Sequence, residues 1–175
     1  TSVFKKDARN KYIITSVVFN LTKVNHKKST AYGAIQEQLS NKNTSDPTLK
    51  NISDAVISIR ESKLPDPKKL GNSGSFFKNP VIDADTFQLF RSHFPDAPFY
   101  EVSPTEFKIP AGWLIEQAGF KGKQYGDAGV HKNQALVLVN YGNATGGEIW
   151  NLALRIQKEV KEIFGIHIEP EVNII

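Results

Sequence analysis

Hydrophobic residues recur along this chain in patterns that predict both strands and helices. Residues 12–21, YIITSVVFNL, are rich in β-branched and aromatic side chains and are apolar on both faces, which predicts a buried strand. Residues 25–45 are polar except for a short apolar patch at 32–39. This stretch is therefore predicted to be a linker with at most one or two helical turns.

The remainder of the chain predicts helices with defined ends. A helix should begin at Asp46-Pro47, because proline is well tolerated in a first turn and apolar residues follow at three-to-four spacing. It should end near Lys63, since residues 64–67 contain two prolines. The further predicted elements are a helix at 83–94, a strand at 106–109, a short helix from Pro110 to Gly119, a glycine-rich loop at 121–130, a buried strand at 134–140, a helix at 147–164 ended by Gly165, and a final strand at 166–175.

These elements indicate an α+β fold, because strands and helices follow one another without regular alternation and no internal repeat is visible. A chain of 175 residues with 39% hydrophobic content can bury a core. No apolar run approaches the roughly 20 residues that span a bilayer, so a cytoplasmic protein without membrane contact is expected. The chain has no Cys, which excludes thiol chemistry, and no Met, which suggests a piece of a longer chain.

The formal net charge of +4 favours acidic partners such as nucleotides, phosphorylated metabolites or nucleic acid. Lysine and arginine are spread along the chain, and no basic run is interleaved with aromatic residues as in single-strand binders. A solvated basic surface explains the charge equally well. A noncatalytic basic module that binds nucleotides or nucleic acid therefore stays open as an alternative function.

Residues 71–80, GNSGSFFKNP, have the most unusual local composition of the chain. Two glycines permit close approach of another group to the main chain, and Ser75 directly follows the second. A plain β-turn with Phe76 and Phe77 in the core is the alternative interpretation. The segment is not a phosphate-binding P-loop, because its lysine and serine are not placed as that motif requires.

Several side chains could take part in acid–base chemistry or anion binding. Ser75 has no histidine tied to it by sequence, so it is a weak candidate nucleophile; as a proton donor it suits only a strongly basic acceptor such as an enolate carbon. Glu169 and Glu171 flank Pro170, and a strand would place both on one face, although exposed strand glutamates are common. Arg60 and Lys63, one helical turn apart, could meet one anion or simply charge a helix end.

Taken in order, several motifs resemble one known family. KLPDPK at 63–68, GNSGSFFKNP at 71–80, AGWLIEQAG at 111–119, VHKNQALVLVN at 130–140 and IEPEV at 168–172 are similar to the C-terminal region of UDP-N-acetylenolpyruvoylglucosamine reductase. The resemblance covers residues 54–175 and, more loosely, the SVFK start and the predicted strand after it. It implies that residues 1–49 are the end of a flavin-binding domain and that residues 50–175 form a substrate-binding domain.

The resemblance also implies an activity. In this family NADPH reduces FAD, and hydride then passes to UDP-N-acetylglucosamine enolpyruvate, which yields UDP-N-acetylmuramate for peptidoglycan synthesis. The family's flavin-pyrophosphate loop and catalytic arginine have no counterpart in this chain. The chain alone is therefore expected to bind neither cofactor and to be inactive, while the parent enzyme is expected to be monomeric, with no nucleic-acid partner.

The implied site residues follow motif by motif. Ser75 matches the serine that protonates the enolate carbon, and Glu171 matches the acid that assists at the substrate carboxylate. Arg60 is a weaker candidate by proximity, and Asn173 stands where the family usually has arginine. No metal site is expected. The residues matched to substrate binding are Tyr32, Lys63, Asn79, Tyr100, Lys108 and Gln134.

Overall fold

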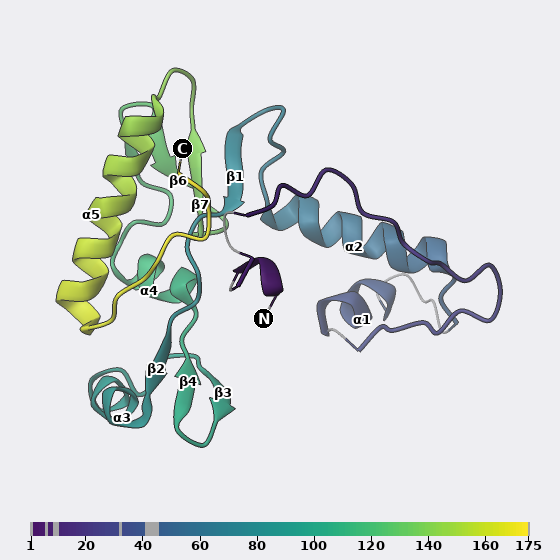
Figure 1. The fold of residues 1–175 in the computed structure, drawn as a ribbon, viewed down its shortest axis with the longest axis horizontal. Helices are drawn as coiled ribbons and strands as arrows, with labels where there is room; N and C mark the ends of the chain where they lie inside the picture. Colours follow the sequence, from purple (N-terminus) through teal and green to yellow (C-terminus); the bar gives the residue numbers. More distant parts are fainter. Residues whose placement is uncertain (1, 6, 9–10, 32, 41–45, 175) are drawn as a thin grey trace.

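A computed structural model of the chain describes residues 2–5, 7–8, 11–31, 33–40 and 46–174. Helices and antiparallel sheets are combined in it, so the predicted α+β class is confirmed. Figure 1 shows two sheets and the long helix α5 in the C-terminal part, and helices α1 and α2 together on the other side. No helix within the described residues is long and apolar enough to cross a membrane.

Within the described residues, the N-terminal part of the chain contains a 3-10 turn and two helices. A 3-10 turn, η1, spans Val3–Lys5, and the helices α1 (Gly33–Ser40) and α2 (Leu49–Lys63) pack against each other. Thr48 caps α2, because its hydroxyl accepts a hydrogen bond from the Asn51 amide and the Asn51 side chain accepts one from the Thr48 amide. The predicted short helix in the linker and the predicted end of a helix at Lys63 are confirmed, whereas the predicted start at Asp46-Pro47 is wrong, because α2 begins at Leu49.

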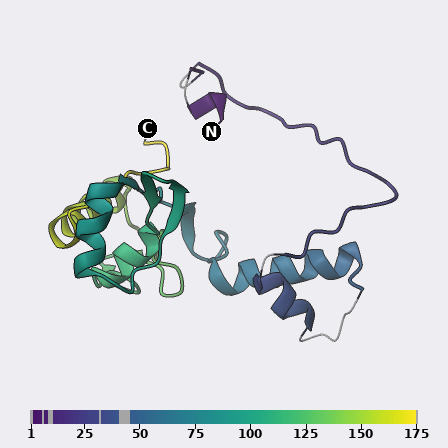
Figure 2. The ribbon, with the colours of Figure 1, turned by 90° about the horizontal axis from the view of Figure 1, so that it is seen from below.

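The predicted buried strand at 12–21 is wrong in this structure. Residues 12–21 form no strand, and their large apolar side chains are exposed, with Val18 94% and Ile13 91% accessible. Figure 2 shows the segment as an extended trace that runs beside neither sheet. A β-branched sequence forms a strand only where another strand satisfies its backbone groups, and no described residue does so here.

The larger sheet has four antiparallel strands in the order β1-β7-β6-β5. The predicted glycine-rich loop at 121–130 therefore contains a hairpin, and the predicted strand at 134–140 begins only at Val137. The loop was predicted because of its glycines, but Gly129 lies within a strand. A β-carbon at Gly129 would lie 2.7 Å from the Tyr141 ring, so glycine permits close packing there. The strands are β1 (Gly71–Ser75), β5 (Gln124–Tyr125), β6 (Ala128–Val130) and β7 (Val137–Asn140).

The smaller sheet has the antiparallel order β2-β4-β3, and α3 packs on one of its faces. The rings of Phe87 on α3 and Phe107 on β4 stack with centroids 3.9 Å apart. Asp83 caps α3 by accepting from the Thr86 amide at 2.8 Å, and this hydrogen bond lowers the pKa of Asp83. The elements are β2 (Val81–Asp83), α3 (Ala84–His93), β3 (Tyr100–Ser103) and β4 (Glu106–Lys108).

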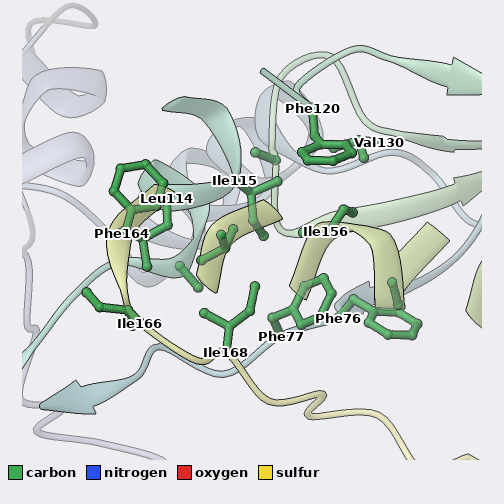
Figure 3. Packing of buried hydrophobic residues seen from close by; sticks show 14 of the residues in the cluster. Phe76, Phe77, Leu114, Ile115, Phe120, Val130, Ile156, Phe164, Ile166 and Ile168 are labelled. Atoms are coloured by element: carbon green, nitrogen blue, oxygen red, sulfur yellow. The ribbon is translucent and has the colours of Figure 1, made fainter. Parts of the chain in front are cut away.

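The main core lies between α5 (Gly146–Phe164), α4 (Ala111–Gln117) and the larger sheet. Figure 3 shows buried side chains of this core, and those that it labels come from α4, α5, β6, the loop residue Phe120 and the segments at 76–77 and 166–168. The predicted end of α5 is confirmed, because Gly165 adopts the left-handed conformation that a helix C-terminus favours.

The predicted strand at 166–175 is wrong over its described part. Residues 166–174 form one isolated bridge, between Pro170 and Phe77. Two main-chain bonds of 2.8 Å, from Lys78 N to Glu169 O and from Glu171 N to Phe76 O, make this bridge. Proline has no backbone N–H, so residue 170 cannot donate to a further strand on its other side.

Candidate functional site

The two residues expected to carry the acid–base chemistry lie on neighbouring segments. Ser75 ends β1 and pairs with Val137 of β7. Glu171 donates its backbone N–H to the backbone oxygen of Phe76, the residue after Ser75. Glu171 and Ser75 are 96 positions apart in the sequence. Both residues are exposed. The fold therefore places two exposed residues, one with a hydroxyl and one with a carboxylate, on neighbouring segments. In the alternative interpretation of residues 71–80, the β-turn is wrong, because residues 71–75 are a strand, whereas the expected burial of Phe76 and Phe77 in the core is confirmed.

Two amide side chains meet at the start of α4. Asn79 Oδ1 accepts from the Ala111 amide at 2.9 Å, which orients the Asn79 side chain. Gln134 Oε1 accepts from the Leu136 amide at 3.3 Å, and a β-carbon on Gly112 would lie 3.4 Å from it. Each oxygen is thus held by a backbone amide. The NH2 groups are the parts of these side chains left to donate to a ligand.

Tyr100 and Lys108 lie directly opposite each other on β3 and β4. Side chains of directly paired residues project from the same face of an antiparallel sheet, so the two lie side by side. Val81 of β2 occupies the same row, because it pairs with Lys108 on the other side. This row begins at Val81, two residues after Asn79 along the chain.

Lys63 lies apart from these groups, at the exposed C-terminal end of α2. Its neighbour Ser62 accepts a hydrogen bond through its backbone oxygen from Asn133 Nδ2, at 3.5 Å. Asn133 immediately precedes Gln134, so this contact brings the end of α2 to the loop that carries Gln134. Arg60, one turn earlier, is also exposed, whereas Tyr32 lies outside the described residues.

The sequence did not indicate a cavity of about 230 Å³ beside Asn79. Lys78 and His167 line it, and Lys78 Nζ forms an ion pair of 3.1 Å with Glu169. A sequence signal was available, because Ile166 and Ile168 are buried and alternate with exposed His167 and Glu169. That alternation places the two polar side chains on one side of the segment. The described residues contain no cluster of three or more potential metal ligands.

His131 is a buried polar residue that no predicted role includes. It follows β6, its backbone N–H donates to Val137 O at 2.9 Å, and its ring Nδ1 has no partner among the described residues. Burial lowers the pKa of His131, and the nearby positive charge of Lys132 lowers it further. The folded protein therefore favours the neutral form of this ring.

We expect His131 to make the fold less stable in mild acid. The folded state resists protonation, so as the pH falls below the ordinary value of 6.5 the unfolded state binds a proton that the folded state does not. The contribution of the neutral His131 ring to the free energy of unfolding is thus complete above this pH and is lost as the pH falls below it. Urea unfolding at pH 7.5 and pH 5.5 should show a smaller pH-dependent loss in His131→Gln than in wild type. His93→Gln, which changes an exposed histidine, is the control, and an unchanged loss in His131→Gln would contradict the expectation.

The structure is an α+β domain in which a strand end, a C-terminal segment and a small sheet carry most of the residues expected at the site. Residues 66–175 match the family described as UDP-N-acetylenolpyruvoylglucosamine reductase, C-terminal domain. Because that match covers more than half of the chain, the chain belongs to this family, and the resemblance seen in the motifs is confirmed.

Individual relatives agree with this assignment. The chain is 64% identical over 174 residues to UDP-N-acetylenolpyruvoylglucosamine reductase of Flavobacterium johnsoniae, covering 99% of the chain and 52% of the relative. It is 48% identical to the reductase of Chromobacterium violaceum, covering 97% and 50%. The chain thus spans about half the length of the relatives it matches. A crystal structure of the reductase from Thermus caldophilus is 22% identical with a TM-score of 0.43, covering 71% of this chain and 33% of that one.

Proposed function

We propose that this chain is the substrate-binding part of a longer reductase that converts UDP-N-acetylglucosamine enolpyruvate to UDP-N-acetylmuramate. The observation that carries the proposal is the contact between residues 75–78 and 169–171, which brings Ser75 and Glu171 onto neighbouring segments. Residues 1–49 are then the end of a flavin-binding domain, and residues 50–175 are the substrate-binding domain. Named relatives with the same reductase activity support this assignment.

The residues at this site would serve in two roles, proton transfer and substrate binding. A hydroxyl and a carboxylate can move a proton but cannot supply a hydride. Another group must therefore supply the hydride for the reduction. FAD reduced by NADPH would supply the hydride, held by the part of the longer protein outside this chain. Ser75 Oγ then gives its proton to the enolate carbon. Glu171 assists at the substrate carboxylate, and the chain by itself binds substrate without turnover.

Binding of the nucleotide end is assigned to Tyr100, Lys108, Asn79, Gln134 and Lys63, with Tyr32 closing over the ligand. A diphosphate is negatively charged, and lysine ammonium groups and amide NH2 groups are suitable donors for its oxygens. Lys63 stands on α2 and the others on the sheets and their loops. Bound diphosphate would therefore link the end of α2 to the rest of the domain, in addition to the Ser62–Asn133 contact.

Lys63→Ala should weaken the binding of UDP about tenfold, because it removes one charge-assisted hydrogen bond of roughly 1.5–3 kcal/mol that is partly screened by solvent. Isothermal titration calorimetry of the chain with UDP measures this change. Lys50→Ala is the matched control, since Lys50 lies on the same helix but pairs with Asp54.

The alternative function, a noncatalytic basic module, makes a different prediction. Such a module would bind poly-dT with strongly salt-dependent affinity and would not distinguish Lys63→Ala from Lys50→Ala. Displacement of UDP by poly-dT, or equal UDP binding by both variants, would favour that module over the reductase.

A further inference from the structure

An apolar groove of about 260 Å³ opens between α3 and the C-terminal end of α5. Its floor is aromatic, because Phe90, Phe94 and Phe164 pack together, with the ring centroids of Phe94 and Phe164 4.9 Å apart. Leu89 and Ile163 also line the groove, and they are 65% and 45% exposed. In Figure 1 these helices are α3 and the yellow end of α5. Exposed apolar side chains beside such a groove are typical of a surface that another molecule covers.

The outer side of α3 is complementary to itself. Asp85, Leu89 and His93 follow one another at four-residue spacing, so they form one exposed stripe along the helix. Leu89 is the midpoint of this stripe, with an acid one turn before it and an imidazole one turn after it. Nδ1 of His93 lies 3.0 Å from the Leu89 backbone oxygen, which leaves Nε2 to meet another group. Where two such helices cross antiparallel at Leu89, Asp85 of each copy faces His93 of the other.

The smaller sheet separates this stripe from the residues assigned to the nucleotide. Phe107 of β4 stacks on Phe87 of α3, so its side chain projects toward α3. Successive residues of a strand project to opposite faces. Lys108 therefore points away from α3, together with Tyr100 and Val81, which pair with it. A contact through the outer side of α3 leaves that row uncovered, so the inference does not rest on the proposed function.

We propose that the groove and the α3 stripe form a two-fold contact between two copies of this chain, with Leu89 at the centre and Asp85 of each copy against His93 of the other. One patch carries both the projecting side chains and the groove that accepts them, as an isologous contact requires. The ten residues of α3 span only about 15 Å. The contact therefore falls below the roughly 1,200 Å² of stable interfaces, and a dissociation constant in the micromolar range is expected. This weak dimer differs from the monomeric state that the family resemblance implies.

A thiol crosslink tests the geometry of the contact. The chain contains no Cys, so one introduced thiol reports on the contact without background. Leu89→Cys places a thiol of each copy at the two-fold axis, and mild oxidation should link them, since a disulfide needs Cα atoms within roughly 7 Å. Gln88→Cys is the matched control, because Gln88 is exposed on the same helix but points about 100° away from Leu89. It should crosslink at least tenfold more slowly, and equal rates would overturn the inference.

Sedimentation equilibrium measures the association itself, from roughly 5 to 500 µM, a range that brackets a weak interface. Wild type should approach twice the mass of one chain. His93→Glu should weaken the dimer at least fivefold, because each new carboxylate would face Asp85 of the other copy. Adding Asp85→Lys to His93→Glu should restore it. Positions 85 and 93 are about 12 Å apart along one helix, so this rescue can only come from contact between copies.

Residues 12–21 are another possible source of self-association, because their large apolar side chains are exposed. Val18→Lys changes one that is 94% exposed and should leave the dimer unchanged. If Val18→Lys abolishes association and His93→Glu does not, the contact belongs to residues 12–21 and the α3 interface is wrong. A wild type that stays monomeric over the whole range also overturns the inference. Both results leave the proposed function as it stands. All these substitutions are at exposed positions, and thermal melts check that each variant is folded.

Discussion

Ser75→Ala is expected to lower kcat for reduction of UDP-N-acetylglucosamine enolpyruvate by about 10²–10⁴-fold, the range for loss of a positioned general acid. The experiment uses the full-length protein that contains this chain and follows NADPH oxidation with formation of UDP-N-acetylmuramate. The physical reason is that alanine has no proton to give to the enolate carbon. Affinity for UDP should not change, because the proposed function assigns the nucleotide to other residues, among them Tyr100 and Lys108.

Ser73→Ala is the matched control, because Ser73 is an exposed serine of the same strand. It should retain wild-type kcat. A Ser75→Ala enzyme with wild-type kcat would show that another group protonates the carbon and would remove Ser75 from the mechanism. A fall in kcat that is matched by Ser73→Ala would instead indicate damage to β1.

The helices could be predicted from the sequence because their signals are local. The spacing of apolar residues and the caps at Thr48, Asp83 and Gly165 lie within the helices or next to them. The strands could not be predicted as well, because a strand needs a partner that can lie far away in the sequence. Residues 12–21 have strand composition but no partner among the described residues, whereas residues 124–130 form a hairpin despite their glycines.

The candidate site shows the same division. The motifs identified Ser75, Asn79 and Glu171 one at a time, because each lies in a distinctive local sequence. The cavity was not predicted, since it depends on the pairing of Lys78 with Glu169, which are 91 positions apart. Its residues become neighbours only once the C-terminal segment crosses residues 76–78. Local sequence therefore indicated single chemical groups, and the fold determined which of them lie on neighbouring segments.

Phe77→Ala is expected to lower the free energy of unfolding by about 3–5 kcal/mol, as for other large core residues cut to alanine. Phe77 is 1% exposed and its ring lies 5.2 Å from that of Phe76. It also forms the bridge with Pro170, so the cavity left behind would lie under the contact that brings Ser75 and Glu171 together. Urea unfolding followed by tryptophan fluorescence measures the change.

Leu89→Ala is the control for Phe77→Ala, because Leu89 is 65% exposed and its truncation should change stability by no more than about 0.5 kcal/mol. A loss for Phe77→Ala as small as that for Leu89→Ala would mean that the segment at 169–171 is not anchored on this core.

Phe77→Ala should also change the kinetics of the full-length enzyme. Below the unfolding temperature, Phe77→Ala should lower kcat in the full-length protein, because Phe77 lies next to the bond from Glu171 N to Phe76 O that joins the segments of Ser75 and Glu171. UDP binding should be retained, because Tyr100 and Lys108 pair on the smaller sheet.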